Sequence, residues 1–221
     1  MTTFKVEKKL GLVLVAAALI TSTVGCAKPA PHVGEAVTQS TNAAGVVVTK
    51  TETRELQDNG KISGTNSELR QVTADVVAVD AVSRLITLRS ADKTTTTFKV
   101  SEKVRNLPQV RAGDRVSLNY FESLTFEVRT PTAEELKTSK TGVVARNPVG
   151  SKPGALAGIG TKGVLTITDI DKTKQQVSFR GPNGTGTVTV KYPENLNYVQ
   201  KGDTVVITAS ELLVADVRPA T

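Results

Sequence analysis

The chain has 221 residues, a length that allows one or two ordinary domains, and a formal net charge of +7. It holds one cysteine, one histidine, one methionine and no tryptophan. A disulfide needs two cysteines and a structural zinc site needs about four Cys or His ligands, so neither can form within this chain, nor can a soft copper site. We therefore expect no catalytic residue, no cofactor and no metal.

The first 25 residues predict a lipoprotein signal peptide. Basic residues open the chain: Lys5, Lys8 and Lys9. Residues 10–20 are an unbroken apolar run that is too short to span a bilayer. Gly25 and Cys26 then resemble the bacterial lipobox, in which the cysteine is lipidated and becomes the mature N-terminus. Thr23 departs from this motif, which prefers Leu there, and the alternative is an ordinary signal with a coincidental cysteine.

The resemblance to lipoproteins also predicts the location of the protein. Ala27 follows the cysteine, whereas an Asp at that position implies retention in the inner membrane. We expect an outer-membrane lipoprotein that faces the periplasm. A lipid anchor of two or three acyl chains is sufficient for stable attachment to the membrane.

Residues 26–70 are predicted to form a flexible tether. The segment has no aromatic residue and is rich in Ala, Thr, Ser, Asn and Gly, so it can bury little apolar surface. Residues 44–52 favour one strand, and the turn signal at residues 58–60 would close a loose hairpin. His32 lies here without partners, so we do not expect it to be a ligand.

The rest of the chain contains an internal repeat. Residues 106–129 align without gaps on residues 195–218, with a constant shift of 89 residues and ten identities in 24 positions. Nearer the start of each copy the shift becomes 91 residues, because one turn is shorter in the second copy. The predicted repeats are residues 71–130 and residues 162–221.

Each copy is rich in Val, Thr, Ile, Leu and Phe in alternation, which is typical of β-strands. The predicted strands of the first copy are 72–79, 84–90, 94–100, 114–120 and 122–129. Those of the second copy are 163–170, 175–180, 185–191, 203–209 and 211–218. The alternation slips between Val76 and Val79, which indicates a bulge. Residues 103–108 and 194–198 favour a single helical turn in each copy.

The pattern predicts an all-β fold. Five short antiparallel strands in each copy most economically close into a small barrel, since closure removes exposed edges. We expect two tandem five-stranded OB-like barrels, and the alternative is one intertwined β-sandwich formed by both repeats. Residues 131–161 would join them as a Gly- and Pro-rich linker with a short helix near its start.

The repeated motifs V-x-A-V-D … I-T-L-R, N-L … V-x-x-G-D-x-V and E-x-L-x-x-x-V-R flank a linker with the sequence Lys-Pro-Gly at residues 152–154. This arrangement resembles a family of uncharacterised bacterial envelope proteins with tandem small OB-like β-barrel repeats behind a lipoprotein-type signal. The resemblance covers residues 71–219 and implies small barrels in the cell envelope, but it assigns no catalytic residues. Periplasmic copper-carrying barrels have the same number of strands, but they bind metal through His and Met, which residues 71–219 lack.

Two sets of polar residues recur in both copies. The first is a Gly-Asp pair, which we expect to be a structural turn rather than a cation site: Gly113, Asp114, Gly202 and Asp203. The second is a Glu and an Arg seven positions apart, which we expect to form a cross-strand ion pair: Glu122, Arg129, Glu211 and Arg218.

These observations favour a lipid-anchored, non-enzymatic protein that binds or scaffolds an envelope protein or glycan. One alternative is a carboxylate-dependent glycan hydrolase, which needs a second carboxylate at a fixed separation from Glu122 or Glu211. The other is an OB-type binder of oligonucleotides or oligosaccharides, which needs a basic groove and stacking aromatic side chains. Export and a near-neutral second repeat argue against nucleic acid as a partner, and the sequence leaves the oligomeric state open.

Overall fold

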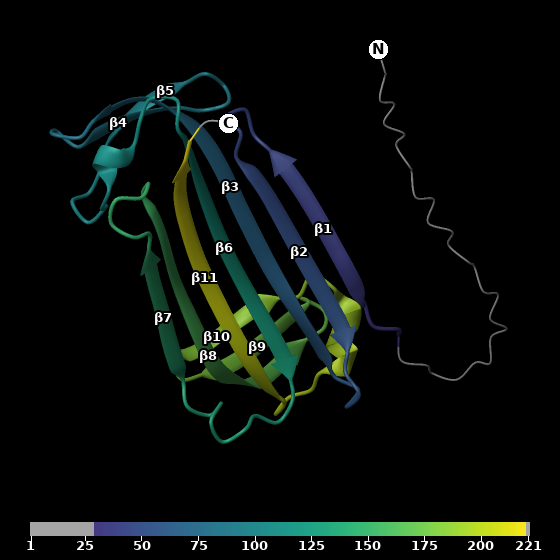
Figure 1. Ribbon diagram of the computed structural model, residues 1–221. Helices are drawn as coiled ribbons and strands as arrows, with labels where there is room; N and C mark the ends of the chain where they lie inside the picture. Colours follow the sequence, from purple (N-terminus) through teal and green to yellow (C-terminus); the bar gives the residue numbers. More distant parts are fainter. Residues whose placement is uncertain (1–28, 220–221) are drawn as a thin grey trace, which may run out of the picture.

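The computed structural model describes residues 29–219, which form one antiparallel sheet of eleven strands (Figure 1). The prediction of an all-β protein is confirmed. Cys26 and the rest of the predicted signal lie outside the described residues. The strands are β1 (Gly34–Thr41), β2 (Val47–Leu56), β3 (Ile62–Asp80), β4 (Leu85–Arg89), β5 (Thr95–Lys99), β6 (Arg115–Val128), β7 (Ser139–Arg146), β8 (Gly154–Asp171), β9 (Gln176–Gly181), β10 (Gly184–Thr189) and β11 (Thr204–Arg218).

The long strands build the central part of the sheet in the order β1-β2-β3-β6-β11-β8, and β7 pairs with the first half of β8. The ends of β3 and β8, from residues 75 and 166 onward, leave this central sheet and pair with β4 and β9 instead. The result is two small lobes at opposite ends of the sheet (Figure 1). The first lobe consists of the end of β3, β4, β5 and the short 3₁₀ helix η1 (Leu107–Gln109). The second lobe consists of the end of β8, β9, β10 and η2 (Pro193–Tyr198).

A β-bulge marks the point where each long strand leaves the central sheet. The pairing of β3 with β4 shifts between Val76 and Ala78, which confirms the predicted bulge. The second copy has its bulge between Ile167 and Asp169. Because an extra residue bends a strand and increases its twist, the bulge redirects the chain from the central sheet into the lobe.

Both lobes pack on the same face of the central sheet, which we call the lobe face. Val116 and Val217 lie opposite each other on β6 and β11, and both pack against the core of the first lobe. Phe126 lies on that same face of β6, an even number of residues from Val116. Arg54 stacks between the ring of Phe126 and the ring of Tyr192 in the second lobe. We call the opposite surface of the sheet the open face.

The repeat has a geometric counterpart in the pairing of β6 with β11. The alignment equates Glu122 with Glu211, and the register places these two residues directly opposite each other. A local twofold rotation about the midpoint between Glu122 and Glu211 exchanges the residues of β6 with their equivalents on β11. The two copies therefore relate to each other as the subunits of a symmetric dimer do.

The prediction of two closed barrels is wrong, because both repeats contribute to one open sheet. The strands expected at 114–120 and 122–129 are the single strand β6, and β11 replaces the corresponding pair in the second copy. With no turn between these segments, neither copy can curl back on itself. The alternative of one intertwined β-sandwich is correct in that both repeats build one structure, but the copies share a single continuous sheet and do not form two packed sheets.

The segments expected to be a tether and a linker are mostly strands. Within residues 34–71, β1, β2 and the first half of β3 form a ladder, and the predicted loose hairpin around residues 58–60 is present. Residues 139–146 and the beginning of β8 likewise pair with each other. These strands are rich in Thr, Ser and Gly, which pair through the backbone although they bury little.

The helical predictions have mixed outcomes. The single helical turns predicted between the third and fourth strands are η1 and η2. The helix expected near the start of residues 131–161 is reduced to one turn, in which the Leu136 amide donates to the carbonyl of Thr132. In the stretch 29–219, the structure holds no helix long and apolar enough to cross a membrane.

Candidate functional site

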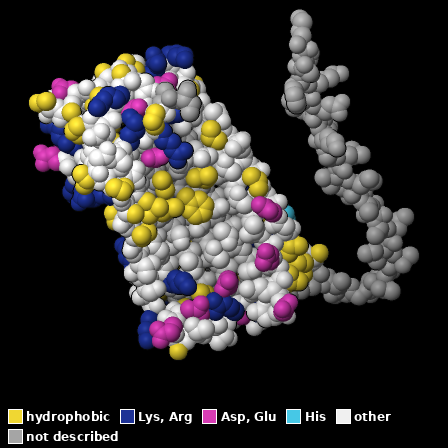
Figure 2. Space-filling view, in the orientation of Figure 1, with side chains coloured by type: hydrophobic (Ala, Val, Ile, Leu, Met, Phe, Trp, Pro, Cys, Tyr) yellow, Lys and Arg dark blue, Asp and Glu magenta, His cyan; other side chains and the backbone are white. Residues whose placement is uncertain are grey.

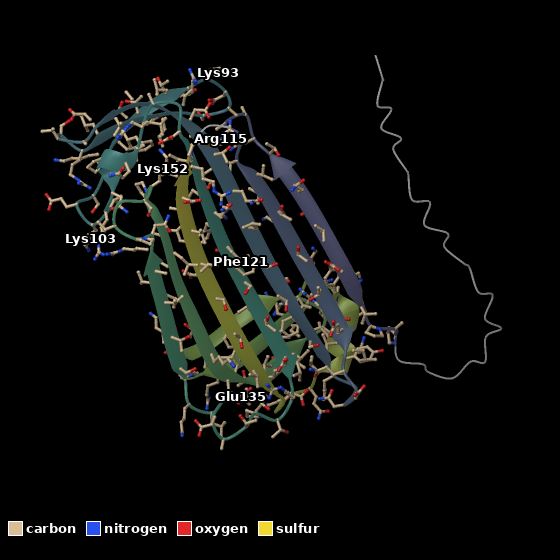
Figure 3. All side chains as sticks on the ribbon, viewed as in Figure 1. Lys93, Lys103, Arg115, Phe121, Glu135 and Lys152 are labelled. Carbon is tan, nitrogen blue, oxygen red and sulfur yellow. The ribbon has the colours of Figure 1, made fainter. Side chains whose placement is uncertain are left out.

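A belt of apolar side chains crosses the middle of the open face. Leu69, Phe121 and Leu212 lie side by side on β3, β6 and β11, and Gly158 continues this row on β8. Val143 on β7 completes it and is 53% exposed. Figure 2 shows apolar side chains gathered across this part of the sheet, and Figure 3 places Phe121 near its centre. We call these five residues the open-face belt.

Gly158 brings its two neighbours in the belt together. A Cβ atom added there would lie 3.0 Å from Cδ1 of Leu212 and 3.3 Å from Cγ1 of Val143. Both side chains therefore lean over the glycine and close the gap that it leaves. The belt is continuous across five strands for this reason.

The lobe face also exposes apolar side chains between the two lobes. Leu118 is 37% exposed, Leu124 and Leu213 are each 42% exposed, and Ile159 is 45% exposed. Among residues 29–219 no second layer covers the middle of the sheet on either side. An exposed apolar surface of this kind is typical of an interaction site.

Three glutamates form a row across the lobe face: Glu68, Glu122 and Glu211. Like charges directly opposite each other on adjacent strands destabilise a sheet. Arg70 and Lys50 offset part of this repulsion, and the distance from Lys50 Nζ to Glu68 Oε2 is 3.2 Å. The Arg70 guanidinium and the Lys50 ammonium hold the pKa of Glu68 below its usual range, against a smaller opposing effect of burial.

The glutamate row also affects a neighbouring tyrosine. Burial, a hydrogen bond to Glu122 and the charges of Glu211 and Glu122 raise the pKa of the Tyr120 phenol. The glutamate row thus disfavours the charged form of this phenol. Over the part of the chain that the structure describes, no group of three or more His, Cys, Asp or Glu side chains is arranged to hold a metal ion.

Each recurring Gly-Asp pair is a turn that is hydrogen-bonded to the β-bulge of its own copy. Gly113 and Gly202 have φ angles of +90° and +93°, which favour glycine. In the first copy the Gly113 amide donates to the carbonyl of Val76 at 2.8 Å, and the Val76 amide donates to the carbonyl of Asp114 at 2.7 Å. Ile167 makes the same two bonds in the second copy. The structure thus gives these residues the turn geometry that the repeat predicts.

Each of these aspartates forms an ion pair with a lysine that directly precedes the long strand of the other copy, upstream of the repeats that the sequence shows. Lys152, just before β8, contacts the Asp114 carboxylate. Lys61, just before β3, contacts Asp203, with 2.7 Å between Nζ and Oδ2. The two lysines are 91 residues apart, which is the shift between the two copies near their starts. The twofold rotation therefore exchanges one ion pair with the other.

The environment of Asp114 favours its charged form. Burial alone would raise the pKa of this carboxyl, but the Lys152 ammonium and the Arg111 backbone amide together hold it below its usual range. The side chain is only 6% exposed, so Lys152 compensates a carboxylate that water reaches poorly.

We predict that Lys152→Met and Lys61→Met each destabilise the protein by about 1–3 kcal/mol, because they leave the buried carboxylate of Asp114 and the half-buried carboxylate of Asp203 without a cation. The measurement is the free energy of unfolding in urea at neutral pH. Lys99→Met, on the exposed strand β5, is the control and should change this free energy by less than about 0.5 kcal/mol. Equal effects of all three substitutions would contradict the structural role of the exchanged pairs.

The predicted pairing of Glu122 with Arg129, and of Glu211 with Arg218, is wrong. Glu211 and Arg218 lie on one continuous strand, and Arg129 directly follows the strand that holds Glu122, so seven residues of extended chain span roughly 23 Å. The arginines do have recurring partners, but these lie two residues earlier in the chain. Arg129 Nε is 2.7 Å from Glu127, and Arg218 Nε is 2.7 Å from Asp216.

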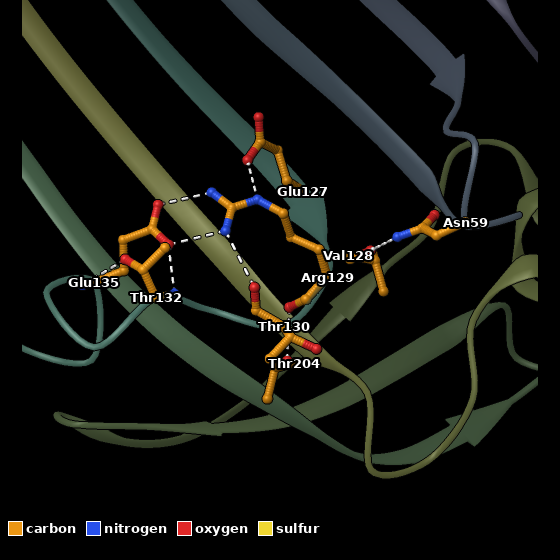
Figure 4. Close-up of polar contacts among 8 residues, drawn as sticks. All are labelled: Asn59, Glu127, Val128, Arg129, Thr130, Thr132, Glu135 and Thr204. Atoms are coloured by element: carbon orange, nitrogen blue, oxygen red, sulfur yellow. Dashed lines mark hydrogen bonds and ion pairs between the residues drawn. The ribbon is translucent and has the colours of Figure 1, made fainter.

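Arg129 makes a second ion pair that Arg218 lacks (Figure 4). Its two terminal nitrogens donate to the two oxygens of Glu135 at 2.8 and 2.7 Å. Glu135 also accepts from the Thr132 amide at 2.9 Å, and the Thr132 hydroxyl oxygen accepts from the Glu135 amide at 3.3 Å. Arg129 therefore holds the turn between β6 and β7 against the end of the sheet. The pKa of Glu135 falls to about 2, with Arg129 as the largest cause.

We predict that Glu135→Gln destabilises the protein at neutral pH and that its difference from the parent narrows in acid. The folded-state pKa lies below the usual value of about 4.3, so the carboxylate stabilises the fold above that value and loses this effect as the pH falls toward about 2. Urea unfolding from neutral pH to about pH 2 measures the difference. A difference that stays constant with pH would contradict the ion pair.

The segment before β1 is fixed to the second lobe. Asn195 accepts a hydrogen bond from the His32 amide at 2.7 Å and donates to the His32 carbonyl at 3.1 Å. The His32 ring stacks on Tyr192 with 3.7 Å between ring centroids. The Tyr198 hydroxyl donates to the carbonyl of Pro29 at 2.8 Å. The part of the predicted tether next to Cys26 is therefore attached to the second lobe.

Comparisons with known proteins do not identify a family. No protein-family model matches the chain, and the searches of curated proteins and of solved structures find no significant match. What the protein does must therefore be argued from its own geometry.

Proposed function

We propose that this protein is a lipid-anchored, non-enzymatic binding protein of the bacterial outer membrane, and that it holds an envelope protein or glycan of the periplasm against the open-face belt. The observation that carries the proposal is the uncovered middle of the sheet. A soluble sheet normally buries one face against a second layer, and here the belt leaves that position open.

The composition of the belt supports binding. Phe121 lies at its centre, flanked by Leu69 and Leu212, and an aromatic side chain surrounded by aliphatic ones is typical of the energetically important part of an interface. The belt runs across five strands without a charged side chain. A partner that covers it would bury apolar surface without desolvating a charge.

The attachment of the N-terminal segment supports the anchor and sets an orientation. Cys26 precedes Pro29 by three residues, which can span at most about 10 Å. Since the Pro29 carbonyl is bonded to Tyr198 in η2, a lipid on Cys26 would hold the second lobe beside the membrane. The first lobe would then point away from it.

The alternatives have less support. Glu122 and Glu211 are adjacent, as a hydrolase with two carboxylates requires, but neither lines the main cavities. An oligonucleotide binder needs several stacking aromatic side chains, and the belt offers only Phe121.

We predict that Cys26→Ser abolishes lipid attachment and releases the protein from the outer-membrane fraction. The measurement is labelling with a palmitate analogue, followed by membrane fractionation of cells. Thr23→Leu is the matched control, because it restores the residue that the lipobox prefers and should label at least as well as the parent. Normal labelling of the Cys26→Ser variant would overturn the anchor.

We also predict that a photo-crosslinking aromatic residue at position 121 captures a periplasmic partner in living cells. The same residue at position 98 is the control, because Phe98 is an exposed aromatic side chain of the first lobe, outside the belt. A defined adduct at 121 and none at 98 is expected. Adducts at 98 alone, or at neither position, would contradict binding at the belt.

A further inference from the structure

The first lobe contains a cavity of about 340 Å³ between its own core and the lobe face of the sheet. The core side chains Ile86, Leu107 and Val110 form one wall, and Ala215 on β11 forms part of the other. This volume lies at the lower end of the range of small-molecule sites in proteins, which are likewise mostly apolar. Comparison with the equivalent space in the second lobe explains why this cavity exists.

In the second lobe the equivalent space is filled by a stack of side chains. The guanidinium carbon of Arg54 lies 5.3 Å from the ring centre of Phe126 and 5.7 Å from that of Tyr192. Arg54 is 9% exposed and donates to the side chain of Asn66 at 2.7 Å. The ring of His32 covers the outer side of Tyr192. A guanidinium between two aromatic rings is a favourable cation–π arrangement.

The first lobe has the guanidinium of this stack without its rings. Arg146 lies opposite Ala155 and Arg54 opposite Gly64, two positions that the repeat equates, so Arg146 is the counterpart of Arg54. The repeat also equates Ala215 with Phe126. Ala215 and Arg146 both line the cavity. The cavity is thus the place that the Phe126 ring occupies in the other copy.

Gly64 accounts for the different burial of the two arginines. A Cβ atom at Gly64 would lie 2.8 Å from Cδ of Arg54, so only glycine lets that side chain lie flat on β3. In the first lobe Ala155 stands at the equivalent position, and Arg146 is exposed at the rim of the cavity. Its guanidinium is accessible to a ligand.

The rim of the cavity is strongly basic. Lys103, Arg105 and Arg146 all line it, and across residues 29–219 none of them forms an ion pair. Asp216 also lines the cavity, but its carboxylate is bound to Arg218 at 2.7 Å. An apolar interior with three uncompensated cations at its mouth favours a ligand that has an apolar body and an acidic group.

We infer that this cavity binds a small aromatic anion, with its ring in the space that Phe126 fills in the other copy and its acidic group at Lys103, Arg105 and Arg146. The flat face of the ring would pack on the Arg146 guanidinium, as Phe126 packs on Arg54. This inference does not depend on the lipid anchor or on the open-face belt. It identifies a second site, in the first lobe, at the opposite end of the sheet from the second lobe.

The experiment is a titration of the full mature chain with 2-naphthoate, in which the fluorescence of the naphthalene ring reports binding. Because the protein has no tryptophan, its own emission interferes little. We expect saturable binding of one molecule per chain. The neutral analogue 2-naphthol should bind at least tenfold more weakly, since it lacks the anionic group that the three cations attract. Decanoate, which has a charge but no ring, should also bind more weakly than naphthoate.

Two variants locate the site. Ala215→Phe introduces the residue that the other copy has and should weaken binding at least tenfold, with an unfolding temperature equal to that of the parent or higher. Ala209→Phe is the matched control on the same face of β11, roughly 20 Å away, and should bind as the parent does. Arg146→Glu changes an exposed side chain, so it should fold normally and lose binding even if Ala215→Phe does not fold.

Other results would overturn the inference. Binding that does not saturate, or that Arg146→Glu leaves unchanged, would mean that naphthoate binds elsewhere on the apolar surface. Tighter binding of decanoate than of naphthoate would mean that the cavity takes an acyl chain and not an aromatic ring. Equal binding of naphthol would show that the basic rim takes no part.

Discussion

The pairing of β6 with β11 connects the two repeats through fourteen residue pairs, and the remaining architecture depends on it. Each of these strands is paired on both sides, β6 with β3 and β11 with β8. The pairing also joins the cores, because Val217 of the second copy packs against the core of the first lobe. A unit of this size buries a small core by itself, so each copy uses the other to complete it.

Polar contacts between the copies reinforce this dependence. The exchanged lysine pairs fasten each Gly-Asp turn with a residue that directly precedes the long strand of the opposite copy. Asn106 makes a similar link, since its side chain donates to the carbonyl of Pro148 at 2.7 Å and accepts from the Gly150 amide at 3.3 Å. Its counterpart Asn195 holds His32 instead. The same side chain therefore immobilises a different segment in each copy.

Local features of the fold could be predicted from the sequence, whereas the arrangement of the sheet could not. The Gly-Asp turns, the bulge near Val76 and the 3₁₀ helices depend on a few neighbouring residues, and the alternation and turn chemistry there are clear. A division of β6 at Phe121 requires a turn, yet residues 120–122 contain no Gly, Pro, Asn or Asp to form one. This absence indicates one long strand, which a closed barrel of five short strands does not accommodate.

The candidate site was harder to predict for a different reason. Phe121 belongs to a strand with apolar residues on both faces, so alternation does not show that one face stays open. Lys61 and Lys152 precede equivalent strands, but an isolated lysine before a strand is usually solvated. Their ion pairs depend on the twofold relation between the copies. That relation is evident only once Glu122 is placed opposite Glu211.

A symmetric homodimer must carry every feature twice, but a single chain that holds both halves can change each half separately. Here Phe126 fills the space beside the second lobe, whereas Ala215 leaves a cavity beside the first. The His32 ring stacks on Tyr192 in the second lobe, and Lys103 is exposed at the rim of the cavity in the first. Fusion of the two copies thus lets one end of the molecule bind its own N-terminal segment while the other end retains a cavity.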